Sequence, residues 1–280
     1  QEADNVAVTG EGGKRMTAWQ DVQALAAEGG YVAPHVDVST CGSGCVHSAH
    51  ILYRTSTISE VELPNGEPSA GQGELRDIAS GLHYAKRREF SWAFLQGANG
   101  SGPFLAISVH TNNQTNSVGK RDRARVGAGL NAWAEAKVKE SGLGTVPMIL
   151  MGDFNSYAGR EPHGMAYQLK QDGWHDSYDA AKNEFKFFDQ AYTTSYTKGN
   201  RSGWPKKPIT KKNPVRIDYV MYKGTGLRAD IYSVDLYLKP DGTFDNDYRS
   251  SDHMMVHAII YFDAASQYLA TASPTPAPTP

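Results

Sequence analysis

The chain has 280 residues, of which 40% are hydrophobic and 21% are charged, and its formal net charge is −2. This composition is that of a globular protein with enough chain for one large domain or two small ones. It excludes binding of polyanions through a high overall positive charge, and no apolar run reaches the ~20 residues that cross a bilayer.

The N-terminal part predicts one helix and two strands. Residues 17–28 are expected to form a helix that Thr17 caps, that carries Val22 and Leu25 on its apolar face, and that ends at Gly29. Residues 31–38 and 50–55 have the alternation of strands. Residues 59–81 are rich in Glu, Gly, Pro and Ser and are predicted to be loop or a small excursion from the main fold.

Cys41 and Cys45 enclose a Gly-Ser-Gly segment, the only two cysteines of the chain. The flexible glycine residues favour a small disulfide-closed loop, which predicts an oxidising compartment and a secreted protein. The alternative is a metal site, for which only His47 and His50 offer further ligands nearby.

The rest of the chain predicts many strands with a few helices between them. Strands are expected at 90–95, 104–110, 148–151, 215–221, 231–238 and 254–261, and helices at 120–140 and 164–171. This order predicts an α/β fold in which packed sheets carry helices on their outer faces. Residues 264–280 are rich in Pro and Thr and are predicted to be a stiff linker towards a further C-terminal module.

The run Pro147–Asn155, PMILMGDFN, is the most informative stretch. Four apolar residues predict a buried strand that delivers Asp153 and Asn155 to the edge of a sheet. On an extended chain these two side chains would point the same way and could orient water, bind a metal or hold a phosphoryl oxygen. The alternative is a turn in which both satisfy local backbone groups.

Other polar residues also lie at predicted strand ends. His110 ends one apolar strand, Asp218 lies inside another and needs a partner if it is buried and charged, and Asp252–His253 precedes the last strand. A lone histidine there is more often structural. Together these groups supply carboxylates, imidazoles and a cation, which are the components of metal-assisted phosphoryl transfer.

The motifs occur in an order that resembles a known family. They are Gln1-Glu2, Arg88-Glu-Phe-Ser-Trp92, Val109-His110, Gly152-Asp-Phe-Asn155, Arg216-Ile-Asp-Tyr219 and Ser251-Asp-His253. The sequence is similar to the endonuclease/exonuclease/phosphatase, or DNase I-like, superfamily over residues 1–263. The resemblance implies a four-layered α/β sandwich of two packed mixed β-sheets flanked by helices, acting as one catalytic domain.

The resemblance also implies roles for individual residues. Glu2 and Asp252 would bind metal, with Asp153 contacting it. Asp153 and Asn155 would orient water and phosphate, His253 would be the base held by Asp218, and His110 would protonate the leaving oxygen or stabilise the phosphorane charge. The substrate-binding residues would be Arg88, with Arg87 as the competing assignment, Tyr53, and the basic residues Lys206, Lys207, Lys211 and Lys212.

The family pattern places a strand ending in a metal-contacting asparagine, and then a helix, before the Gln-Glu motif. This sequence begins at Gln1-Glu2. We expect the missing strand and helix to precede Gln1 in the complete protein.

The substrate is predicted from the segment 198–216, which carries seven Lys or Arg residues, no acidic residue, and Trp204. Such a segment suits a nucleic-acid backbone, although a solvated loop explains it too. We therefore expect a secreted, monomeric nuclease that uses Mg²⁺, Mn²⁺ or Ca²⁺. The alternatives are a sphingomyelinase-type phospholipid phosphodiesterase, another phosphoesterase of the superfamily, or a catalytically silent binding domain.

Overall fold

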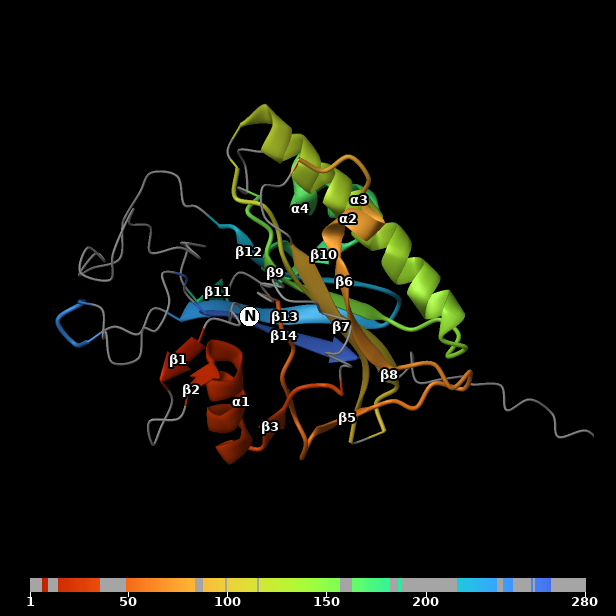
Figure 1. The fold of residues 1–280 in the computed structure, drawn as a ribbon, viewed down its shortest axis with the longest axis vertical. Coiled ribbons are helices and arrows are strands. Elements are labelled where there is room, and N and C mark those ends of the chain that lie inside the picture. Colours follow the sequence, from red (N-terminus) through yellow and green to blue (C-terminus); the bar gives the residue numbers. More distant parts are fainter. Residues whose placement is uncertain are drawn as a thin grey trace, which may run out of the picture.

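A mixed sheet of seven strands forms the centre of the computed structural model (Figure 1). The structure describes residues 7–9, 15–35, 49–83, 88–98, 100–114, 116–156, 163–181, 186–187, 216–235, 239–243, 253 and 255–262. The strand order is β10 (His175–Asp176), β12 (Asp218–Lys223), β9 (Met148–Asp153), β8 (Pro103–His110), β7 (Glu89–Gly97) and β5 (Ile58–Glu60), and β6 (Ala70–Glu74) also pairs with β7. Only β8 and β9 run parallel, and the other pairs are antiparallel.

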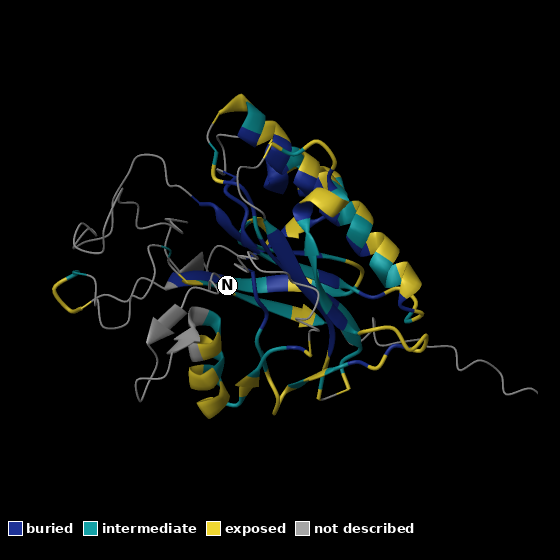
Figure 2. Ribbon diagram, in the orientation of Figure 1, coloured by how far each residue is buried: buried dark blue, intermediate teal, exposed yellow. Residues whose placement is uncertain are grey.

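Helices cover one face of this sheet. The longest is α3 (Ser117–Glu140), which packs with α2 (Leu75–Ile78) and α4 (Met165–Gln171). Its buried stripe includes Val126, Leu130 and Ala134, and the main core forms between this stripe and alternate residues of β7, β8, β9 and β12. Figure 2 shows the buried strands in the middle and exposed residues on the outer side of α3. The predicted helix at 120–140 is thus confirmed, and it starts earlier because Asn116 accepts a hydrogen bond from the Gly119 amide at 2.8 Å.

A second mixed sheet packs on the opposite face. It contains β11 (Lys186–Phe187), β13 (Leu227–Asp235) and β14 (Met255–Phe262), with β11 parallel and β14 antiparallel to β13. Phe104 of β8 meets Phe262 of β14, with ring centroids 5.3 Å apart. The short helix α5 (Ser177–Ala180) contacts both β13 and β12. The predicted class, α/β with two packed mixed sheets and flanking helices, is therefore confirmed.

The N-terminal elements lie on the other side of the molecule from α3 (Figure 1). They are β1 (Ala7–Thr9), β2 (Arg15–Thr17), α1 (Ala18–Glu28), β3 (Tyr31–Val32) and β4 (Tyr53–Arg54), with β1 paired to β2 and β3 to β4. The helix expected at 17–28 is found. Of the strand expected at 31–38, only Tyr31–Val32 is a strand within the described residues 31–35, where Pro34 has no amide donor, and residues 36–38 lie outside the described part of the chain. Of the strand expected at 50–55, only Tyr53–Arg54 is a strand.

The largest error of the sequence interpretation is at 59–81. These residues were expected to be loop or a small excursion, but they include the end of β5 and all of β6 and α2, and β6 belongs to the central sheet. Gly71 and Gly73 occupy β6 because the rings of Trp92 and Phe90 on β7 lie where a Cβ at these positions would be. Since glycine weakens a strand, a strand built this way has no clear sequence pattern.

The remaining strands and the second helix are shifted by a few residues. The expected strands at 215–221, 231–238 and 254–261 are observed as Asp218–Lys223, Leu227–Asp235 and Met255–Phe262. The helix expected at 164–171 is α4, with Gly164 at its N-cap position. Within the described residues, no helix is long and apolar enough to cross a membrane.

Candidate functional site

Three neighbouring strands place polar residues in one row. His110, the last residue of β8, is in register with Asp153, the last residue of β9, and Asp153 is in register with Asp218, the first residue of β12. Their neighbours Val109 and Tyr219 belong to the core under the helices. Because side chains alternate along a strand, His110, Asp153 and Asp218 face the second sheet. The row therefore forms at the seam between the two sheets.

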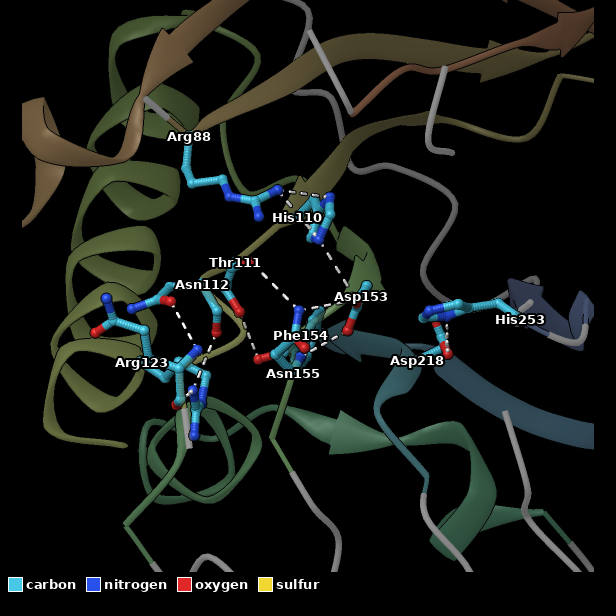
Figure 3. A network of polar contacts seen from close by, with 11 residues as sticks. Arg88, His110, Thr111, Asn112, Arg123, Asp153, Phe154, Asn155, Asp218 and His253 are labelled. Atoms are coloured by element: carbon cyan, nitrogen blue, oxygen red, sulfur yellow. Dashed lines mark hydrogen bonds and ion pairs between the residues drawn. The ribbon is translucent and has the colours of Figure 1, made fainter. Parts of the chain in front are cut away.

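His253 completes the row from the second sheet. Its Nδ1 lies 2.9 Å from Asp218 Oδ2 and 3.1 Å from Asp218 Oδ1 (Figure 3), and His253 lies two residues before the first residue of β14. This contact gives the buried Asp218 carboxylate the partner that the sequence interpretation required. An Nδ1–H that donates to a carboxylate leaves the lone pair of the neutral imidazole on Nε2. The pair thus has the arrangement of a base and the carboxylate that orients it.

Asp153 and Asn155 meet, but not in the predicted way. Asn155 has a φ of 48°, so the chain leaves the extended conformation, and the expected i, i+2 alignment on a strand is wrong. Asp153 instead accepts from the Asn155 amide at 2.7 Å and from Asn155 Nδ2 at 2.8 Å. The Thr111 carbonyl also accepts a hydrogen bond from Asn155 Nδ2, at 3.3 Å. A left-handed turn therefore fixes the acid and the amide against each other, as the alternative interpretation allowed.

Arg88 lies beside His110. Its Nη1 is 3.0 Å from His110 Nδ1 and 3.2 Å from Nε2, and Figure 3 shows His110 between Arg88 and Asp153, whose Oδ2 is 3.5 Å from Nε2. Burial, with smaller effects of Arg88 and His253, lowers the pKa of His110 to about 3. His110 is therefore neutral at neutral pH in this geometry. A charged-acid role would need an anion beside Arg88 to raise the pKa.

Glu89 is a further residue of the site that the sequence interpretation did not select. Phe90 pairs with Val109, so the next residues in register are Glu89 and His110. Glu89 is 4% exposed and, by alternation with Phe90, lies on the face of His110. Asp218 was selected as an acid inside an apolar strand, and Glu89 gives a similar signal, because it lies directly before the apolar strand expected at 90–95.

Tyr53 is not brought to the row. Its hydroxyl lies 3.3 Å from Glu60 Oε1, and Glu60 pairs with Leu95. Leu95 is near the C-terminal end of β7, whereas Glu89 is the first residue of that strand. Six residues of strand separate Leu95 from Glu89, which corresponds to about 20 Å. The structure therefore gives no support to a substrate contact by Tyr53.

Several predicted residues lie outside the described part of the chain. These are the metal ligands Glu2 and Asp252, the basic residues Lys206, Lys207, Lys211 and Lys212, and the cysteine pair Cys41 and Cys45. The same holds for Arg87 and for the linker at 264–280. Arg216, which the sequence interpretation counted in the basic segment, is described. It is 3% exposed and bonded to Asp176, so its inclusion in a surface patch is wrong.

The donor set of the row fits a divalent cation. Asp153, Asp218 and His253 each offer one ligand atom, and these atoms lie within 4.8 Å of one another. The two carboxylates are 3% and 6% exposed, so their negative charges are concentrated where water screens them little. Oxygen ligands of this kind suit Mg²⁺, Mn²⁺ or Ca²⁺. Asp153 is common to this cluster and to the predicted ligand set.

Comparisons with known proteins show the family and the fold. Residues 18–253 match the Endonuclease/Exonuclease/phosphatase family. A Bacteroides thetaiotaomicron protein of that family is similar in structure, with a TM-score of 0.60, 18% identity, and coverage of 85% of this chain and 76% of the other. No curated protein matches the sequence.

Two further similar structures are of proteins whose names state different phosphoester substrates or products. A mannosyl-6-phosphatase from Bacteroides thetaiotaomicron has a TM-score of 0.56 and 20% identity, and the match covers 83% of this chain and 78% of the other. D. rerio TDP2, complexed with a single-strand DNA product, has a TM-score of 0.52 and 15% identity, with coverage of 86% and 82%. At these identities the likeness shows a shared fold.

Proposed function

Because the chain belongs to the endonuclease/exonuclease/phosphatase family, whose members hydrolyse phosphoester bonds, we propose that it is a secreted, divalent-metal-dependent phosphodiesterase that cleaves nucleic acid. The observation that carries the proposal is the seam between the sheets, where His110 and Asp153 face the Asp218–His253 pair. It combines a base, two acids and, through Arg88, a cation in one place.

In the proposed reaction, water attacks phosphorus and the P–O bond to the leaving group breaks. His253 accepts the proton of the water at Nε2, and Asp218 stabilises the imidazolium that forms. Asn155, whose amide is fixed by Asp153 and Thr111, orients the attacking water or a phosphoryl oxygen. Arg88 neutralises phosphate charge beside His110, whose ring N–H donates to the leaving oxygen or to the equatorial oxygens.

Asp153 would hold the cation, together with Glu2 and Asp252 as the family resemblance implies. Bound there, the ion supplies charge neutralisation at the phosphoryl oxygens. Asp218 is assigned to His253 instead, because both of its oxygens lie within 3.1 Å of the ring nitrogen.

Nucleic acid is the substrate class favoured by the basic segment 198–212. This segment carries Lys198, Arg201, Lys206, Lys207, Lys211 and Lys212 without an acidic residue, and it leads to the strand that begins at Asp218. Cationic side chains next to the site would follow a phosphate backbone and make binding fall with salt. The DNA bound to D. rerio TDP2 is consistent with this class.

The direct test is hydrolysis of plasmid DNA and RNA by the full-length protein, with Mg²⁺ and with EDTA. We expect cleavage that EDTA abolishes. Asp153→Asn should lower kcat by about 10²- to 10⁴-fold while leaving the circular dichroism spectrum unchanged, on the scale of a lost catalytic group. Asp179→Asn makes the same chemical change at a carboxylate that is 55% exposed and serves as the control.

Intact DNA and RNA under all metal conditions would reject the nuclease assignment. Sphingomyelin liposomes and a sugar phosphate should be assayed in parallel. Hydrolysis of sphingomyelin or of the sugar phosphate without cleavage of nucleic acid would support the phosphoesterase assignment but change the substrate class. Turnover of none of them would favour a silent binding domain.

A further inference from the structure

Arg216 is a buried cation two residues before Asp218. It is 3% exposed, and its partner Asp176 on β10 is 2% exposed. The two form a fork, with Nη1 at 2.9 Å from Oδ1 and Nη2 at 2.6 Å from Oδ2. The pair therefore ties the residues before β12 to the neighbouring edge strand.

Aromatic rings connect Arg216 to the Asp153–Asn155 turn. The guanidinium carbon lies 4.3 Å from the centroid of the Tyr219 ring, and Tyr219 stacks on Phe154 at 4.8 Å and 13°. Phe154 is the residue between Asp153 and Asn155, and Figure 3 shows it beside both. The Tyr219 hydroxyl donates to the Ser156 carbonyl at 2.8 Å, and the Phe154 amide donates to the Ile217 carbonyl at 2.8 Å. Arg216 thus supports the Asp153–Asn155 turn through the rings of Tyr219 and Phe154.

The same cation reaches the second sheet. Tyr178 lies 4.6 Å from the guanidinium carbon and makes an edge contact with Tyr232 of β13 at 5.1 Å and 80°. Burial raises the pKa of Tyr232, Arg216 lowers it, and Asp176 and Asp218 raise it. The Tyr232 hydroxyl therefore lies close enough to Arg216, Asp176 and Asp218 to interact electrostatically with all three. Since β13 pairs along β14, Arg216 is linked to the strand that follows His253.

Stability alone is a weak reason for such a pair. A buried ion pair gains attraction but loses the hydration of both charges, and apolar residues of similar volume often serve stability equally well. A geometric role is better supported here, because the contacts of Arg216 lead to Asp153, to Asp218 and to the sheet that carries His253.

We propose that Arg216, fixed by Asp176, is a positioning residue that sets the geometry of the Asp153–Asn155 turn and of the Asp218–His253 pair across the two sheets. The proposal rests on the proposed hydrolytic function for its kinetic consequence. Its structural consequence, the hydrogen bond between His253 and Asp218, is measurable without any substrate.

The test replaces both partners, since either single apolar variant would leave a buried charge unpaired. Asp176→Leu/Arg216→Met should keep the thermal midpoint close to that of the wild type. It should lower kcat on bis(p-nitrophenyl) phosphate by about 10²-fold, with KM changed by less than about twofold, because a small displacement of a reacting group is that costly. The proton resonance of the His253 ring N–H, assigned by its absence in His253→Asn, should lose its hydrogen-bonded shift.

Lys223→Met is the matched control. Lys223 is the last residue of β12, at the opposite end of that strand from Asp218. Its Nζ donates to Glu135 Oε1 at 2.6 Å and to Asn131 Oδ1 at 3.0 Å. It should leave kcat and the His253 resonance unchanged. A folded double variant with wild-type kcat and an unchanged His253 resonance would overturn the proposal.

The two proposals fail in different ways. If the wild type hydrolyses no phosphoester, the resonance still decides whether Arg216 positions the pair. If the double variant does not fold, Arg216→Lys replaces it, since the ammonium keeps a positive charge beside Asp176 but cannot form the fork or the planar contact with Tyr219. A wild-type resonance and a wild-type kcat in that variant would then reject the positioning role.

Discussion

At the scale of single residues, His110 shows how burial and a neighbouring cation decide a charge. The side chain is 12% exposed, and Arg88 lies within 3.0 Å of one ring nitrogen. Both effects oppose protonation, and they lower the pKa of His110 to about 3. The residue is thus prepared to meet an anionic phosphate as a neutral ring between a cation and a carboxylate.

This shift has a consequence for stability. In the unfolded chain the pKa of His110 is about 6.5, so between about pH 3 and pH 6.5 the unfolded state binds more protons than the folded state. Stability should therefore rise with pH over this interval and be complete above about pH 6.5, with a contribution of at most about 1.4 kcal/mol per pH unit. Urea unfolding between pH 4 and 7 measures the slope.

His110→Asn should remove this contribution and flatten the slope. His257→Asn, which removes an exposed imidazole on β14, should leave the slope as it is. Equal slopes in His110→Asn and the wild type would contradict the assignment of the shift to His110.

At the scale of elements, β9 is held between β8 and β12 with Gly152 one residue before Asp153. Gly152 has a φ of 145°, and a Cβ there would overlap the carbonyl oxygen of Val109. The close approach of β8 and β9 at this point brings His110 and Asp153 together. The strand was expected at 148–151, but it continues through Gly152 to Asp153.

Gly152→Ala should therefore be costly. The methyl group would separate β8 from β9 in addition to straining the backbone, and we expect a loss of about 3 kcal/mol or more in the free energy of unfolding. Gly144→Ala provides the comparison, because Gly144 has a φ of 76° and no atom within 4 Å of an added Cβ. It should cost only the backbone term of about 1–2 kcal/mol. Similar losses in both variants would show that the strand contact is unimportant.

Elements whose pattern is local were predictable. The helix α3 has an apolar stripe at Val126 and Leu130, and most residues of the strands β7, β8 and β9 are apolar. The strand β6 was not predictable, because its glycine residues are required by the aromatic rings of the neighbouring strand β7, which leave no room for a side chain. The turn at Asn155 was predicted only as the alternative to an extended chain, because the contacts with Asp153 and Thr111 that hold its left-handed conformation depend on the tertiary structure.

At the scale of the whole molecule, the site depends on the contact between two sheets. His110, Asp153 and Asp218 belong to one sheet and His253 adjoins the other. Each could be proposed from its place at a strand end, but their convergence depends on how the sheets pack. That packing is set by contacts between residues far apart in the sequence, such as Phe104 and Phe262, which no local pattern encodes.

Phe104→Ala tests this dependence. The ring is partly buried against Phe262, so its loss should lower the free energy of unfolding by about 1–3 kcal/mol, less than for a fully buried ring. It should also lower kcat, because the sheets that hold Asp218 and His253 would be less firmly fixed. Denaturant unfolding and turnover of bis(p-nitrophenyl) phosphate are the measurements.

Tyr261→Ala is the matched control, as Tyr261 is next to Phe262 on β14 but 43% exposed. It should change kcat little. If Phe104→Ala loses stability and keeps full turnover, the seam between the sheets tolerates more movement than the site geometry suggests.

The position of His253 also matters for the chain during its synthesis. A ribosome delivers Arg88, His110 and Asp153 first, Asp218 later, and His253 near the end of the described residues. Pairings between distant segments form slowly, and the second sheet needs β14 before it can dock. The proposed chemistry needs His253, so we expect it to begin only after the chain has been synthesised through β14.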